Sequence, residues 1–205
     1  NTKVMWICSP NNPTGSAAEA EDLAKFAQRA ECIVVIDEAY IDFSSKPSML
    51  GRLHELPNVV VMQTLSKAWG SAGVRCGMAF AQPAIIALMN NVKYPYNVNM
   101  LTQQFAIERL RRHDEVAQQV KTLLAERDWL IGQLGQTACV KHIYPTDANF
   151  VLVRVTDANA IYNALLRQGI VVRNRSRVEK CEGCLRITVG THDENETLMK
   201  HLQEF

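Results

Sequence analysis

The sequence predicts an α/β protein that begins with a mostly parallel sheet and ends in a smaller α+β domain. Apolar runs at residues 4–7, 33–36 and 58–62 have the length of buried strands, and a polar cluster follows each of them. The segment 17–30 has the amphipathic spacing of a helix, as a crossover between parallel strands requires. Because ligands bind beyond the carboxyl ends of the strands in such sheets, we expect the polar clusters to converge on one crevice.

The bulk properties exclude several classes of protein. A chain of 205 residues can bury a sizeable core in one or two domains, and its formal net charge of +1 argues against a partner such as nucleic acid. No apolar stretch reaches the roughly 20 residues that cross a bilayer, and the start Asn1-Thr-Lys3 lacks the pattern of a signal peptide. We therefore expect a soluble, cytoplasmic protein that does not bind membranes.

The six cysteines favour reduced thiols over disulfides. Four of them lie in or beside apolar runs, which is the usual setting of reduced core cysteines: Cys8, Cys32, Cys76 and Cys139. Cys181 and Cys184 form a single C-x-x-C pair with no second pair and no histidines at ligand spacing. A zinc or redox site is thus a disfavoured alternative, and we expect no metal.

The first loop holds its polar side chains on a stiff backbone. Residues 3–8 form the expected strand, after which Pro10 and Pro13 restrict the chain and Gly15 permits a positive φ. Asn12 is therefore fixed in place, either to bind a ligand or to satisfy the backbone of the turn itself.

The second cluster follows a strand at 32–36 that is apolar on both faces, as a strand covered by helices is. Asp37 ends this strand, and Tyr40 lies three residues later. The acids at 37 and 38 could serve a ligand, or they could cap a helix or lie in an exposed turn.

The third cluster surrounds Lys67. A loop with one helical turn is expected at 44–56, and a strand at 58–63 precedes the stretch Thr64-Leu-Ser-Lys-Ala-Trp-Gly70. Because lysine is almost never fully buried alone, a lysine after a core strand requires an ion pair or a covalent role such as a Schiff base. A surface lysine that opens the next helix is the alternative.

The remaining elements complete two domains and a linker. A strand at 74–81 and a short helix at 84–89 precede a hinge at 93–99, and one or two helices follow over 101–134, stopped by Gly135. Strands are expected at 139–144, 149–155, 171–173 and 184–189, with helices at 157–168 and 193–204. The expected domains are 1–96, a helical linker 97–135, and 136–205.

These motifs resemble a known family. The order of Cys8-Ser-Pro-Asn-Asn-Pro-Thr-Gly15, Ile33-Val-Val-Ile-Asp-Glu-Ala-Tyr40 and the lysine stretch is similar to that of the fold-type I pyridoxal-phosphate (PLP) aminotransferases. Further segments resemble the histidinol-phosphate branch: Ala39–Phe43, Lys93–Asn99, Asp147–Val153 and Gly183–Thr191. The resemblance implies a fold-type I PLP-transferase in which 1–96 is part of the PLP-binding large domain, and in which the strand at 74–81 is antiparallel.

The resemblance also implies a role for each site residue. Lys67 is the lysine that joins the cofactor and carries the substrate's α proton, and Asp37 faces the pyridine nitrogen. Tyr40 and Asn12 donate hydrogen bonds to the 3′ oxygen. The cofactor phosphate is bound by two hydroxyls and a guanidinium, those of Thr64, Ser66 and Arg75. A plain surface ion pair is the alternative role of Arg75.

Substrate binding is assigned by the resemblance to the last domain. Arg186 matches the arginine that grips the substrate carboxylate, and in this branch it must serve both glutamate and phosphate. Arg173 resembles a second ligand of the substrate phosphate, although each arginine could be a simple surface residue. Asn149 contacts the substrate or caps the start of its strand.

The implied reaction is PLP-dependent transamination between L-histidinol phosphate and 2-oxoglutarate, giving imidazole acetol phosphate and glutamate, in histidine biosynthesis. A homodimer is implied as well. Because the chain begins in the middle of the family's pattern, we expect a truncated piece that alone binds PLP weakly and has little activity. Alternatives are an aromatic or other related aminotransferase, a threonine-phosphate decarboxylase, and a non-catalytic fragment; no phosphate-loop motif supports a nucleotide-binding protein.

Overall fold

The computed structural model describes residues 1–205 and divides them into two compact units. The first unit contains residues 1–11 and 17–119, and the second contains 12–16 and 120–205. The short segment 12–16 belongs to the second unit because its backbone is bound there: the Asp147 amide donates to the Gly15 carbonyl at 2.7 Å. The three-part division drawn from the sequence has different limits and stays a prediction.

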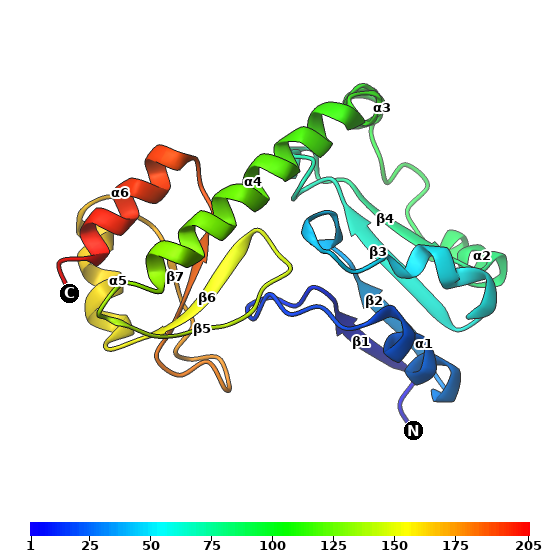
Figure 1. Ribbon diagram of the computed structural model, residues 1–205. Helices are drawn as coiled ribbons and strands as arrows, with labels where there is room; N and C mark the ends of the chain where they lie inside the picture. The colour runs from blue at the N-terminus through cyan, green and yellow to red at the C-terminus, as the bar shows by residue number, and fades with distance from the viewer. The chain divides into compact units, whose positions relative to one another are not determined.

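The first unit is built on a four-stranded sheet in the order β1-β2-β3-β4 (Figure 1). The strands are β1 (Val4–Cys8), β2 (Ile33–Asp37), β3 (Val59–Thr64) and β4 (Gly77–Ala81). The first three are parallel and β4 is antiparallel to β3. Each strand was predicted from its apolar run, and the antiparallel direction of the last one is confirmed.

The helices of this unit connect and cover its strands. They are α1 (Ala20–Arg29), α2 (Pro83–Val92), α3 (Met100–Arg111) and the first two turns of α4 (His113–Leu134), with short 3₁₀ helices η1 (Ile41–Phe43), η2 (Met49–Glu55) and η3 (Ala72–Val74). The apolar face of α1 packs with η2 on one core that includes Val34, Ile36 and Val61. Leu23, Ala24 and Ala27 form the buried stripe of this helix, whereas Phe26 is 39% exposed.

Helices α2 and α3 bury none of their residues. Large apolar side chains are exposed along both helices and the connection between them, namely Leu88, Met89, Val92, Tyr94, Tyr96, Met100, Leu101, Phe105, Ile107 and Leu110. We call this set the α2–α3 apolar surface. Helices of 10 and 12 residues are unusual without burial, because packing supplies most of the stability of short helices.

The second unit contains an antiparallel sheet in the order β5-β6-β8-β7. Its strands are β5 (Val140–Ile143), β6 (Phe150–Val155), β7 (Arg173–Asn174) and β8 (Cys184–Thr188), and its helices are α5 (Ala158–Arg167), α6 (His192–Leu202) and the rest of α4. The alternation of side chains along β6 and β8 gives the sheet two different faces. One face forms the core, and the other carries polar and aromatic groups.

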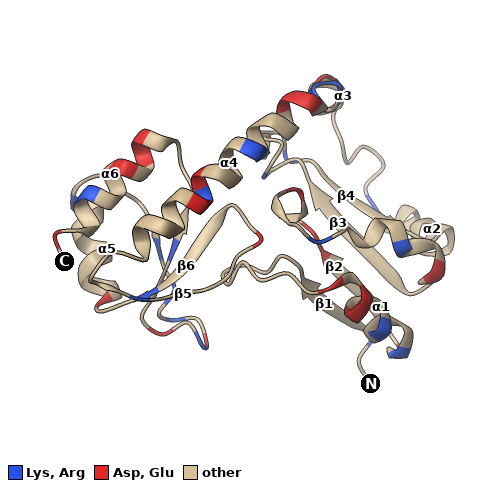
Figure 2. Cartoon of the chain, viewed as in Figure 1, with Lys and Arg blue, Asp and Glu red and all other residues tan.

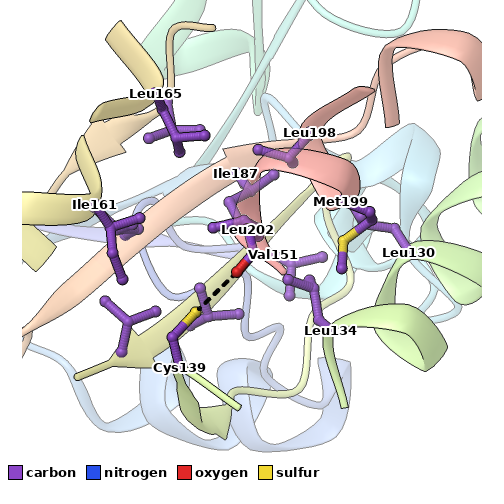
Figure 3. Close-up of a cluster of buried hydrophobic side chains, with 14 of the residues drawn as sticks. Leu130, Leu134, Cys139, Val151, Ile161, Leu165, Ile187, Leu198, Met199 and Leu202 are labelled. Atoms are coloured by element: carbon purple, nitrogen blue, oxygen red, sulfur yellow. Dashed lines mark hydrogen bonds between the residues drawn. The ribbon is translucent and has the colours of Figure 1, made fainter. Parts of the chain in front are cut away.

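The core of the second unit lies between the sheet and its helices (Figure 3). Val151 on β6 and Ile187 on β8 face Ile161 and Leu165 of α5 and Leu198 of α6. The thiol of Cys139 is fully buried there and its sulfur lies 3.7 Å from the Leu202 carbonyl oxygen. Burial raises the pKa of this thiol, as expected of a structural cysteine.

His192 gives the second unit a pH-dependent contact. Its Nδ1 lies 3.1 Å from Glu126 Oε2 and its Nε2 lies 3.4 Å from Glu196 Oε1. The hydrogen bond to Glu126, followed by the charges of the carboxylates, raises the pKa of His192. Its stabilising contribution is therefore complete below the unfolded-state pKa of about 6.5 and is lost as the pH rises through the higher folded-state pKa.

This predicts an NMR titration of His192 with a midpoint above that of a free histidine. The same experiment on a Glu126→Gln variant should bring the midpoint down, because it removes the first and largest cause of the shift. A midpoint at or below the free value in the unaltered chain would contradict the prediction.

Charged side chains of both signs are interspersed in each unit (Figure 2), in keeping with a formal net charge of +1. None of the helices combines the length and the apolar character needed to span a bilayer.

Candidate functional site

Asp37 and Tyr40 extend from the end of β2. Asp37 is the last residue of this strand, which lies between β1 and β3, and its Oδ1 accepts a hydrogen bond from the Ala39 amide at 2.9 Å. This bond holds the carboxylate at the strand end. It is also the kind of bond expected if Asp37 only caps the backbone that follows it, which was the alternative to binding a ligand. Tyr40 is 8% exposed. The amine Nζ of Lys67 lies 5.0 Å from the centre of the Tyr40 ring, so the structure brings these two predicted residues together.

Lys67 lies in a loop that backbone hydrogen bonds hold together at Leu65. The Leu65 amide donates to the Cys76 carbonyl at 3.1 Å, and the Ser71 amide donates to the Leu65 carbonyl at 2.9 Å. The flanking side chains of Leu65 and Ala68 are buried, whereas Lys67 itself is exposed. The exposure of Lys67 agrees with the alternative of a surface lysine, and the group that the structure places beside its amine is the Tyr40 ring rather than an acid.

The hydroxyls of Thr64 and Ser66 lie side by side. Their oxygens are 2.9 Å apart, and the Ser66 amide donates to Thr64 Oγ1 at 3.1 Å. Arg75 ends the loop in the left-handed conformation with φ of 57°, and its Nη1 donates to the Ala72 carbonyl at 3.0 Å. The side chain of Arg75 is exposed and forms no salt bridge in the structure, so the surface ion pair considered from the sequence is not observed.

A cavity of about 240 Å³ lies among these groups in the first unit. Its walls are Asp37, Ala39, Met62, Gln63, Thr64, Ser66, Arg75, Cys76 and Gly77. Two hydroxyls and a guanidinium at one cavity suit a dianion such as a phosphate monoester, and the carboxylate suits a protonated ring nitrogen. The cavity lies at the ends of the parallel strands β2 and β3 and beside the start of β4, whereas β1 and the loop after it contribute none of its wall residues.

Helix α3 holds the lysine loop through two side chains that the sequence analysis did not identify. Arg109 Nε donates to the Trp69 carbonyl at 2.8 Å, and Thr102 Oγ1 donates to the Val74 carbonyl at 3.3 Å. Forty residues separate Arg109 from Trp69. No motif marks these positions, because the contacts depend on tertiary packing rather than on local pattern.

The predicted substrate arginines lie together in the second unit. Arg173 and Arg186 are directly opposite on the antiparallel strands β7 and β8, so their side chains leave the same face of the sheet. The guanidinium of Arg186 lies 4.9 Å from the centre of the Phe150 ring, and its Nη1 donates to Asn12 Oδ1 at 2.8 Å. This face is the one opposite the hydrophobic core.

Asn149 and the pair Cys181 and Cys184 also lie in the second unit. The Asn149 carbonyl accepts from the Val189 amide at 3.0 Å, which anchors the start of β6. Cys181 and Cys184 are buried beside Leu152 and Tyr144, and burial raises the pKa of Cys181. The structure brings no group of three or more His, Cys, Asp and Glu side chains together at a spacing suited to a metal.

The site residues thus fall into two sets. The first unit holds Asp37, Tyr40, Thr64, Ser66, Lys67 and Arg75, and the second holds Asn12, Asn149, Arg173 and Arg186. The sequence could identify residues of both sets because they lie at the ends of predicted strands or on the strands themselves. The bond between Asn12 and Arg186 spans 174 residues of sequence, and no local pattern predicts it.

Comparison with known proteins gives a consistent result. Residues 1–202 match the family model described as "Aminotransferase class I and II". The chain is 53% identical over 202 residues to the histidinol-phosphate aminotransferase of Parabacteroides distasonis and 50% identical over 204 residues to that of Bacteroides thetaiotaomicron. These alignments cover 98% and 100% of the chain but 59% of each relative.

Solved structures share the fold. The histidinol-phosphate aminotransferase of Clostridium acetobutylicum superposes with a TM-score of 0.92 at 24% identity, covering 98% of this chain and 63% of that one. The histidinol-phosphate aminotransferase of Sinorhizobium meliloti, solved in complex with pyridoxal-5′-phosphate, superposes with a TM-score of 0.87 at 27% identity. That alignment covers 98% of this chain and 56% of the other.

Proposed function

Because this chain belongs to the aminotransferase class I and II family, we propose that its protein is a PLP-dependent histidinol-phosphate aminotransferase. It would transfer the amino group of glutamate to imidazole acetol phosphate, giving histidinol phosphate and 2-oxoglutarate, or run in reverse, in histidine biosynthesis. Identities of about 50% to relatives of that name support this choice. The chain spans about 59% of the length of these relatives, so the activity is proposed for the whole protein.

The observation that carries the proposal is the cavity at the ends of β2 and β3. Asp37 would hold the cofactor's ring nitrogen protonated, and Thr64, Ser66 and Arg75 would bind its phosphate. Tyr40 would donate a hydrogen bond to the cofactor's 3′ oxygen. Bound PLP supplies an electron-withdrawing ring that stabilises negative charge on the substrate's α carbon.

Lys67 would bind the cofactor covalently and move the substrate proton. Its exposed amine reaches past the Tyr40 ring, and exposure leaves it free to approach a bound ligand. The amine would also act as the base that takes the proton from the substrate's α carbon. Asn12 of the second unit would be a further ligand of the cofactor in this proposal.

The two arginines of the second unit would select the substrate. Like charges directly opposite on neighbouring strands repel each other, and a bound anion removes that cost. Arg186 can offer a planar fork to the carboxylate of glutamate or to the substrate phosphate, and Arg173 adds a second charge for the phosphate. Asn149 would contact the substrate beside them.

The proposed function is tested by incubating the whole protein with PLP, reducing with borohydride and mapping the labelled peptides by mass spectrometry. The proposal expects Lys67 to be labelled well above exposed lysines such as Lys25 and Lys121. Equal labelling of all lysines would contradict it. Transamination assays on the whole protein with histidinol phosphate and with aromatic amino acids then separate this substrate from its nearest rivals.

Arg186→Ala is predicted to impair substrate binding. Loss of a charge-assisted bond to the substrate anion should raise the KM for histidinol phosphate by roughly 10- to 100-fold, with a smaller change in kcat. Arg167→Ala, at the exposed end of α5, is the control and should leave KM unchanged. An unchanged KM in Arg186→Ala would remove this residue from the substrate site.

A homodimer is also part of the proposal, and the α2–α3 apolar surface supports it. Exposed apolar side chains in such number favour an interface, and neither helix buries a residue within the chain. Sedimentation at several concentrations would test this, since a monomer at all of them contradicts it. The free thiols of all six cysteines favour action in the reducing cytoplasm.

A further inference from the structure

Glu38 is the only Asp, Glu, Lys or Arg side chain that the fold buries, with 2% of its surface exposed. It follows Asp37 directly, at the end of β2. Burying a carboxylate costs several kcal/mol unless hydrogen bonds compensate it, so such a residue is retained where its bonds have a use. The proposed chemistry does not use Glu38, and it does not line the cavity.

Three donors surround this carboxylate. Oε2 accepts from Ser48 Oγ at 2.6 Å and from Gln63 Nε2 at 2.9 Å, and Oε1 accepts from the Met49 amide at 2.7 Å. The Ser48 oxygen also accepts from the Leu50 amide at 3.1 Å, so its own hydrogen is directed to Glu38. A carboxylate offers two acceptor oxygens, which suits it to all three of these bonds.

These bonds join three segments that are distant in the sequence. Glu38 lies one residue from Asp37, Ser48 and Met49 begin η2, and Gln63 lies one residue from Thr64. The Glu38 amide also donates to the Met62 carbonyl at 2.8 Å, which extends the pairing of β2 with β3. Glu38 therefore fixes the backbone on two walls of the cavity, one formed by residues 37–39 and the other by residues 62–64.

We propose that Glu38 is a positioning residue of this site: its buried carboxylate holds Asp37 and Thr64 at the spacing in which the cavity takes its ligand. The role in cofactor binding rests on the proposed function, whereas the role in holding the two strand ends does not. Glu38 acts from behind the cavity wall, through Gln63 and the backbone, and touches neither substrate nor cofactor.

The test compares Glu38→Gln with the unaltered chain by amide hydrogen exchange. Glutamine has the same shape but keeps one acceptor oxygen, so its amide group meets at least one donor and leaves a buried bond unmade. Exchange at residues 37–41 and 62–66 should become on the order of tenfold faster, while β6 and β8 keep their rates. Glu55→Gln, at an exposed position of η2, is the matched control.

A double variant tests whether the bonds themselves are responsible. Glu38→Gln with Gln63→Glu restores a carboxylate facing an amide and should recover most of the lost protection. No change at either strand end, acceleration spread evenly over the chain, or no recovery in the double variant would each overturn the proposal.

Cofactor binding is measured separately by titrating PLP into the same variants at a temperature where circular dichroism shows them folded. Glu38→Gln should weaken PLP binding about tenfold relative to Glu55→Gln. If even the unaltered whole protein shows no binding at Lys67, the proposed function fails and the exchange experiment still decides the role of Glu38. Local loosening with unchanged PLP affinity would overturn the role in ligand binding.

Discussion

Lys67→Arg is expected to abolish stable attachment of PLP and to reduce transamination by the whole protein by at least about 10²- to 10⁴-fold, the usual contribution of a positioned proton-transfer group. Arginine keeps the positive charge beside the Tyr40 ring, but its guanidinium stays protonated and cannot serve as nucleophile or base. The measurement is borohydride trapping with peptide mapping, together with a single-turnover assay.

The exposed position of Lys67 makes this variant informative, because the fold should tolerate it. Melting temperatures within about 1 °C of the unaltered chain are expected, as surface substitutions usually change stability by less than about 0.5 kcal/mol. Lys121→Arg on α4 is the control and should lose neither label nor activity. Retained activity in Lys67→Arg would exclude the proposed function in its present form.

The second large effect is expected at Gly15. This residue has φ of +79°, and a Cβ added there would lie 2.1 Å from Thr146 Oγ1 and 2.7 Å from Thr146 Cβ. Thr146 cannot rotate away cheaply, because its hydroxyl donates to the Phe150 carbonyl at 2.8 Å and accepts from the Ala148 amide at 3.1 Å. Gly15→Ala should therefore lower the free energy of unfolding by about 2–5 kcal/mol, combining left-handed strain with overpacking.

Gly169→Ala separates the two causes. Gly169 has nearly the same φ, +77°, but a Cβ added to it would meet no atom within 4 Å. It should lose only the backbone contribution, about 1–2 kcal/mol. Urea denaturation followed by the fluorescence of Trp129 in the second unit would measure both variants, and equal losses would show that the contact with Thr146 is unimportant.

Much of the fold could be predicted from apolar runs and glycines. The strand ends near Asp37 and Gln63 were predictable because each of these polar residues follows four apolar ones, although β3 extends one residue further, to Thr64. Gly135 correctly marked the end of α4. The boundaries were less accurate: α1 begins at Ala20 rather than Ala17. The residues before Ala20 fit the amphipathic pattern of a helix in the sequence. They belong to the preceding loop instead, where the Ala18 amide donates to Ser9 Oγ at 3.0 Å.

The candidate site was predictable as a set of residues but not as a geometry. Parallel neighbours bring Asp37 and Thr64 to one edge, so their convergence followed from strand order. The exposure of Lys67, the burial of Glu38 and the contact of Arg109 with the lysine loop did not follow. Each depends on which distant segment lies nearby, and a single sequence carries no direct record of that.

The assignment of residues 12–16 to the second unit bears on how this protein can be dissected. The polypeptide passes from one unit to the other at three places, between residues 11 and 12, 16 and 17, and 119 and 120. A single proteolytic cut at the last junction would leave the second unit's piece containing Gly15 attached to the other fragment. Expression of residues 120–205 alone would remove the partner of Thr146 and Asp147, so a separately folding second unit would need residues 12–16 joined to it through a new connection.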